Sequence, residues 1–117
     1  MKNSMRIDII TLFPEFFTVP LAISILGRAS QNGCVSYHIH NMRDAATDKH
    51  GTVDDTPYGG GPGMVLKVDI VKRALDSAIA QGPTDQQPYV ILLTPQGDML
   101  QQTLSHSLTN KPWLIFI

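Results

Sequence analysis

RIDIITLF, at residues 6–13, is the segment that most constrains the architecture of this chain. It is short, rich in β-branched residues and mostly apolar, which is typical of a strand buried on both faces in a parallel sheet. Pro14 ends it, because proline has no N–H to donate to a strand ladder. A second near-continuous apolar run, YVILLT at residues 89–94, also predicts a buried strand. The two runs predict a parallel sheet.

Between these runs the sequence alternates helical and strand patterns. Apolar residues recur at helical spacing after Pro20 and predict an amphipathic helix; they are Ala22, Ile25, Leu26 and Ala29. Asn32-Gly33 supplies the stop signal, since Gly suits a left-handed position after a helix. The segment CVSYHIHNM, residues 34–42, then predicts a strand with one partly exposed face. Its apolar residues alternate with polar ones: Val35, Tyr37 and Ile39 against Ser36, His38 and His40.

The second half repeats this alternation. A helical stripe predicts a helix with Asp69 as N-cap and Gly82-Pro83 as the stop; it is formed by Val71, Ala74, Leu75, Ala78 and Ile79. A third helix, capped by Asp98 and ending at Asn110, is predicted from Leu100, Leu104 and Leu108. Residues 113–117 predict a further buried strand.

The element order is β-α-β-loop-α-β-α-β, which predicts an α/β fold with a mostly parallel sheet and flanking helices. A buried strand is normally followed by a turn and a covering helix. Neither follows residues 113–117. We therefore expect this sequence to be the N-terminal portion of a longer protein.

Composition narrows the functional classes. The chain has 117 residues, the size of one domain, and its nine Lys+Arg and ten Asp+Glu nearly cancel. This argues against a heavily basic nucleic-acid binder that works mainly by phosphate neutralisation. The single cysteine, Cys34, is expected to be a small buried residue at a strand start and excludes a disulfide framework. No segment resembles a signal peptide or membrane span, so we expect a soluble cytoplasmic protein.

PYGGGPGM, at residues 57–64, lies in a polar stretch from Arg43 to Gly63 where periodicity vanishes. Long loops in compact domains are usually functional or disordered. The glycines match neither a Walker A loop nor a dinucleotide fingerprint, which excludes the common phosphate cradles. A mobile surface loop and a backbone-lined ligand surface both remain. Pro57 and Pro62 restrict the segment in a way that a slack linker does not need.

Three other groups are candidates for chemistry. Asp54-Asp55 lie close to His50 in the sequence. Either these carboxylates only solvate or cap the loop, or they have a functional position beside its exposed N–H groups. The segment LLTPQGD, residues 92–98, lies at the carboxyl end of a predicted strand, where open α/β sheets bind ligands. An ordinary strand-to-helix turn has the same sequence pattern. His38 and His40 lie two apart on one strand face, but no third ligand has suitable spacing, so no metal site is expected.

Taken together, several segments resemble the bacterial tRNA (guanine-N1)-methyltransferases, the TrmD family of knotted SPOUT methyltransferases. The segments are ITLFPEFF at 10–17, GRASQNG at 27–33, RD at 43–44, HGTVDDTPYGGGPGM at 50–64 and LTPQG at 93–97. The match runs in order along almost the whole chain, and the TVDD-x-PYGGGPGM block is highly specific.

The resemblance implies transfer of a methyl group from S-adenosyl-L-methionine to N1 of guanosine 37, beside the tRNA anticodon, by a homodimer. It implies that the first cofactor loop is formed by Leu92, Leu93, Thr94, Pro95, Gln96 and Gly97. It implies a surface that meets the target guanine, formed by Asp54, Pro57, Tyr58, Gly59, Gly60, Gly61, Pro62 and Gly63. A target base must leave its stack to be methylated, and a glycine-lined wall lets a flat base lie against backbone.

The resemblance also implies what the sequence lacks. The family's second and third cofactor loops, its catalytic aspartate and the partner arginine match no segment here, so we expect no catalytic residue in this chain. Residues 1–117 are then expected to be the N-terminal part of the methyltransferase domain. We expect the knot to be incomplete in this chain and the chain to be inactive by itself. The alternatives are a non-enzymatic RNA-binding module that retains the substrate surface, and an unrelated nucleotide-binding α/β domain.

Overall fold

Four parallel strands form the sheet around which the chain is built. The computed structural model describes residues 4–47, 51, 53–55 and 65–117, with backbone only at 54, 55 and 65. The strand order is β2-β1-β6-β5, and every neighbouring pair is parallel. The strands are β1 (Met5–Thr11), β2 (Val35–Asn41), β5 (Tyr89–Ile91) and β6 (Trp113–Phe116). The predicted α/β class is confirmed.

Strand β1 lies in the interior of the sheet, between β2 and β6. Its register aligns Arg6 with Ser36 on β2 and with Trp113 on β6. Side chains aligned in this way share one face of the sheet, because residues alternate between the two faces. The sequence run that predicted a buried strand is therefore the segment that joins both halves of the sheet.

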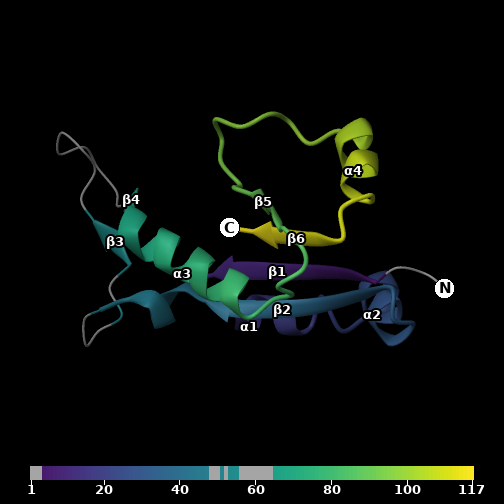
Figure 1. Ribbon diagram of the computed structural model, residues 1–117, viewed down its shortest axis with the longest axis horizontal. Coiled ribbons are helices and arrows are strands. Elements are labelled where there is room, and N and C mark those ends of the chain that lie inside the picture. The colour runs from purple at the N-terminus through teal and green to yellow at the C-terminus, as the bar shows by residue number, and fades with distance from the viewer. Residues whose placement is uncertain (1–3, 48–50, 52, 56–64) are drawn as a thin grey trace.

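Helices cover both faces of the sheet (Figure 1). Helix α3 (Val68–Ala80) packs on the face that carries Ile10 and Ile115. The opposite face carries α1 (Glu15–Thr18) and α2 (Ser24–Gln31). On this second face the Tyr37 hydroxyl donates to the Leu26 carbonyl, 3.0 Å away. Helix α4 (Gln102–Leu108) lies beside β5 and β6.

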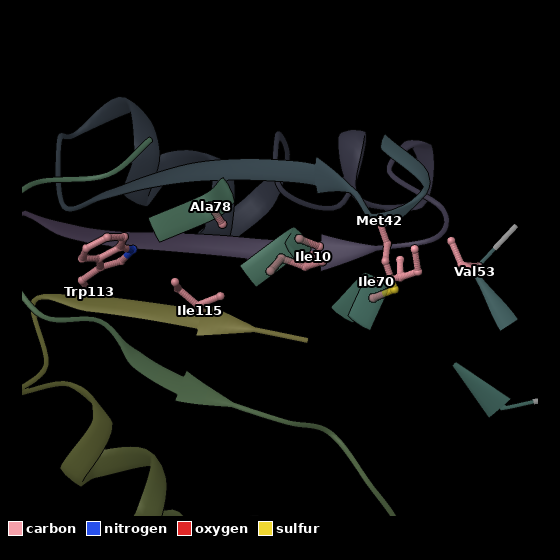
Figure 2. Packing of buried hydrophobic residues seen from close by; sticks show 8 residues of the cluster. Ile10, Met42, Val53, Ile70, Ala78, Trp113 and Ile115 are labelled. Carbon is pink, nitrogen blue, oxygen red and sulfur yellow. The ribbon is translucent and has the colours of Figure 1, made fainter. Parts of the chain in front are cut away.

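The hydrophobic core lies between α3 and the sheet (Figure 2). Its small residues, Ala74 and Ala78, let the helix axis approach the strands closely. The remaining buried members are larger: Ile10, Met42, Val53, Ile70, Trp113 and Ile115. The stripe predicted for this helix is confirmed, since Val71, Leu75 and Ile79 pack partly buried against the same cluster.

The expectation of an unstructured stretch from Arg43 to Gly63 is wrong for two of its described segments. A 3-10 helix, η1 (Met42–Ala45), follows β2 directly, and its N-cap Asn41 accepts a hydrogen bond from the Arg43 N–H. Strand β3 (Asp54–Asp55) then pairs with β4 (Val65–Leu66) in an antiparallel ladder. Two-residue strands carry too little periodicity to be read from sequence.

Several predicted boundaries are corrected. The strand predicted at 89–94 is assigned as β5 only as far as Ile91, although backbone pairing continues to Leu93, and Leu92 and Leu93 are mostly exposed. Helix α3 begins one residue before Asp69, which lies in the first turn and pairs with Arg73 instead of capping. Helix α4 begins at Gln102, so Asp98 is not its cap, and it ends at Leu108.

The helix predicted after Pro20 has a different packing from the one expected. Its α-helical part begins only at Ser24, and the predicted apolar residues Ile25 and Leu26 are exposed. The helix is fixed through Gly27, where a side chain would overlap the Ala22 carbonyl. The apolar stripe is therefore mostly exposed, and only Ala29 of its four residues is half-buried. The predicted stop at residues 32–33 is confirmed, with Gly33 at a φ of +75°.

Gly82, two residues after the end of α3, makes a close contact that its sequence context does not reveal. A Cβ at this position would lie 2.3 Å from Cζ2 of Trp113, so the indole packs directly on the glycine backbone. Cys34 is half-buried and not fully buried as expected. Among the described residues, no helix is both long and apolar enough to cross a membrane.

Candidate functional site

The segment predicted to hold a cofactor borders an apolar groove. The groove has a volume of about 550 Å³ and runs between α4 and the β5–β6 edge of the sheet. Four of the six predicted residues line it, namely Leu92, Leu93, Thr94 and Gly97, whereas Pro95 and Gln96 do not. Its other walls are mostly apolar and include Leu104, Leu114 and Phe116. A mainly apolar concavity with a few polar groups is typical of a small-molecule site.

Backbone hydrogen bonds shape this loop. The Leu93 N–H donates to the Ile117 carbonyl and the Ile117 N–H donates to the Ile91 carbonyl, so pairing continues past the end of β5. The chain then turns at Thr94, whose side-chain oxygen accepts from the Gln96 N–H and whose carbonyl accepts from the Gly97 N–H. The Thr94 hydroxyl and the turn are therefore held at the groove's rim.

Of the predicted guanine-facing residues, only Asp54 lies within the described part of the chain, as a backbone position in β3. Pro57, Tyr58, Gly59, Gly60, Gly61, Pro62 and Gly63 lie outside the described residues. The base of this segment is anchored. Val53 is 1% exposed in the main core, and its carbonyl accepts a 2.7 Å hydrogen bond from the Lys67 N–H.

A buried ionic cluster on β1 was missed by the sequence reasoning. Asp8 is fully buried and accepts hydrogen bonds from three side chains. The Arg6 guanidinium donates to both carboxylate oxygens, His40 Nε2 lies 2.6 Å from Oδ2, and Trp113 Nε1 donates to Oδ1 over 2.8 Å. The signal was present, since a lone carboxylate inside an otherwise apolar strand requires buried partners.

The electrostatics of this cluster keep Asp8 ionised. Burial alone would raise the pKa of the Asp8 carboxyl, but the hydrogen bonds from Arg6, His40 and Trp113 outweigh it and lower that pKa below its ordinary value. Burial also lowers the pKa of His38, assisted by the positive charge of Arg6, while the charge of Asp8 opposes the shift.

The histidine pair of β2 does not form a metal site with other described residues. No group of three or more His, Cys, Asp or Glu side chains suited to a metal occurs in the described part of the chain. The prediction of a partly exposed polar strand face is consistent with His40, whose side chain is 14% exposed and points toward Asp8. His38 is half-buried and contacts Ser36.

Comparison with known families gives a match over nearly the whole sequence. The profile described as tRNA (Guanine-1)-methyltransferase TrmD matches residues 5–117. A tRNA (guanine-N(1)-)-methyltransferase of Brevibacillus brevis is 50% identical over 113 residues, covering 97% of this chain and 45% of the relative. A protein of the same description from Streptomyces avermitilis is 45% identical over 116 residues, covering 97% and 41%.

The fold also has a close structural counterpart. A crystal structure of a tRNA (m1G37) methyltransferase from Aquifex aeolicus superposes with a TM-score of 0.83 at 32% identity, covering 97% of this chain and 50% of that one. The expected α/β architecture of this family is confirmed by that superposition. The chain spans less than half the length of the two curated relatives.

Proposed function

Because the chain belongs to the tRNA (guanine-1)-methyltransferase TrmD family, we propose that it forms the first part of a SPOUT domain that methylates N1 of guanosine 37 in tRNA. The donor is S-adenosyl-L-methionine, and the complete protein acts in the cytoplasm as a homodimer. The family match along residues 5–117 is the observation that carries this proposal.

The cofactor side of the proposal rests on the groove beside α4. Its volume of about 550 Å³ is within the range of small-molecule sites. The leucine side chains and Phe116 suit an adenine ring and the methylene groups of the methionine chain, whereas the Thr94 hydroxyl and loop backbone suit polar atoms of the adenosine. S-adenosyl-L-methionine supplies an electrophilic methyl group when bound. We assign Leu92, Leu93, Thr94, Pro95, Gln96 and Gly97 to its binding.

The substrate-binding part of the proposal concerns the segment between the paired strands β3 and β4. We assign Asp54 and residues 57–63 to the guanine, with the glycines admitting the flat base against backbone. The anchoring of Val53 in the core supports this role, since a base-positioning loop gains from a rigid foundation.

Removal of the guanine N1 proton requires a general base. We assign no residue of this chain to that role and propose that it belongs to the remainder of the complete protein. Residues 1–117 then contribute binding and orientation. By themselves they transfer no methyl group.

The test is a chimera in which residues 5–117 replace the matching 113-residue segment of the Brevibacillus brevis relative. With S-adenosyl-L-methionine and unmodified tRNA, the chimera is expected to form 1-methylguanosine, measured by nucleoside mass spectrometry. The isolated chain is expected to form none. A folded chimera that binds tRNA without methylating it would instead favour an RNA-binding module.

A further inference from the structure

A second groove, of about 510 Å³, opens on the α3 face of the sheet at its β2 edge. The end of β2, the η1 helix and the residues after it, and the middle of α3 form its walls. Its polar lining includes His40, Asn41, Asp44, Thr47, Arg73 and Ser77. None of these residues belongs to the cofactor or guanine surfaces proposed above.

His40 on the groove wall is held through one of its ring nitrogens. Its Nε2 lies 2.6 Å from the buried, ionised carboxylate of Asp8, so Nε2–H is the donor of that bond. The structure gives Nδ1 no partner among the described residues. Asp8 therefore fixes the orientation of an imidazole that lines the groove.

Arg73 supplies a fixed cation on the opposite wall. Its Nη1 donates to the Ala45 carbonyl over 2.6 Å, and its Nη2 lies 3.4 Å from Asp69. These two bonds orient the guanidinium, yet its side chain remains 45% exposed. A guanidinium carries five N–H donors, so several remain for a ligand. Oriented arginines are well suited to phosphate oxygens.

The groove also contains an acidic residue, which does not suit a simple anion. Asp44 adds a carboxylate acceptor beside the donors, and a ligand made only of phosphate leaves that acceptor unmatched. A ribose-phosphate unit satisfies both kinds of group, since its phosphate accepts from Arg73 and its hydroxyls donate to Asp44 beside the His40 ring. The 2′-hydroxyl is the group that distinguishes RNA from DNA at such a contact.

We propose that this groove binds a ribose-phosphate unit of an RNA strand, through Arg73, His40 and Asp44. The inference rests on the proposed function, because it makes the groove an outlying contact for the same tRNA. The groove is connected with the guanine-facing segment: η1 forms one wall, and the Arg43 side chain of η1 donates to the Gly51 carbonyl just before β3.

The test measures binding of the 117-residue chain to a fluorescent anticodon stem–loop RNA and to DNA of the same sequence, by anisotropy across a salt series. Arg73→Gln is expected to weaken RNA binding severalfold and to lower the slope of log K against log salt by about 0.7, as for one lost phosphate contact on a single strand. Lys72→Gln is the matched control. It removes the same charge from the adjacent position of α3, and Lys72 does not line the groove.

Two further variants separate the groove from general charge. Ser77→Trp fills the groove from an exposed position and is expected to weaken RNA binding severalfold without changing charge. Asp44→Asn is expected to reduce the preference for RNA over DNA. Circular dichroism checks that each variant is folded. Inorganic phosphate, added as a competitor, is expected to displace RNA only weakly, whereas strong displacement would identify a free-phosphate site and overturn the proposal.

Equal losses in Arg73→Gln and Lys72→Gln, or unchanged binding by Ser77→Trp, would overturn the groove assignment while RNA binding itself persists. Undetectable RNA binding by the wild-type chain would overturn it as well, because all the proposed contacts lie within this chain. Neither result decides the methyl transfer, which the chimera measures separately.

Discussion

Trp113 Nε1 donates a 2.8 Å hydrogen bond to Oδ1 of Asp8, joining residues 105 positions apart in the chain. The same carboxylate accepts from Arg6 on its own strand and from His40 on β2. Arg6 also lies over the Trp113 ring, 5.7 Å from its centroid. One buried carboxylate therefore ties together β2, β1 and β6.

Removing this carboxylate is expected to be strongly destabilising. Asp8→Ala leaves the donors of Arg6, His40 and Trp113 without their shared acceptor in a buried site. The free energy of unfolding is expected to fall by about 3–5 kcal/mol, measured by urea denaturation. Asp76→Ala is the control, since Asp76 pairs with Lys72 on the surface and is expected to cost at most about 0.5 kcal/mol. Similar losses in both variants would refute a structural role for the cluster.

Stability is expected to fall with acid in two stages. The pKa of His38 is below 6.5 in the folded protein, so as the pH drops below 6.5 the unfolded chain takes up a proton before the native one does. The pKa of Asp8 is below 3.8, so its contribution is present above that value and is lost as the pH falls through the folded pKa.

The measurement is the urea midpoint as a function of pH for the wild type and His38→Gln. The substitution is expected to flatten the decline below about pH 6.5 and to leave the decline below about pH 4 in place. A midpoint that rises on acidification would contradict both assignments.

Two glycine substitutions are expected to differ sharply. Gly82→Ala places a Cβ 2.3 Å from the Trp113 ring, and the ring is buried and cannot move freely, so a loss of about 1–3 kcal/mol is expected. At Gly97 the nearest atom to a new Cβ is the Thr94 carbonyl oxygen at 3.4 Å, so Gly97→Ala is expected to be nearly neutral. Thermal unfolding measures both. Equal effects would show that the indole does not rest on Gly82.

Val53 is expected to govern local opening at the base of β3 and β4. Val53→Ala removes two methyl groups from the core beside Ile70 and Met42, at a cost of about 1–2 kcal/mol. The Lys67 amide, which donates to the Val53 carbonyl, is expected to exchange hydrogen faster by a matching factor. Val68→Ala, at an exposed neighbouring position, is expected to leave this exchange rate unchanged.

The layer arrangement was predictable because its signals are local. The β-branched run at residues 6–13 and the Ala74–Ala78 stripe each contain the periodicity of the element they form. The exposure of the apolar α2 stripe was not predictable, because periodicity reports two faces of a helix but not which one meets the sheet. The strand predicted through Thr94 ended early because apolar composition does not reveal where pairing stops.

The candidate sites also differ in whether a local stretch of sequence indicates them or only contacts between distant segments create them. The cofactor segment was identified by its resemblance and by its place after a strand, and its assignment stays a prediction. The Asp8 cluster and the second groove depend on contacts between β1, β2, α3 and β6 that no local window contains. Gly82 likewise acquires its role from a ring on a distant strand.

The central claim is that this chain carries two separate surfaces, one for the guanine and one for the cofactor. In the Brevibacillus brevis chimera, Gly60→Val tests it most directly, with kcat/KM for tRNA methylation and the Kd for S-adenosyl-L-methionine measured on the same preparation. The expected result is at least a tenfold loss in kcat/KM, corresponding to about 1.4 kcal/mol, with the cofactor Kd unchanged. An unchanged kcat/KM, or an equal loss in cofactor affinity, would contradict the account.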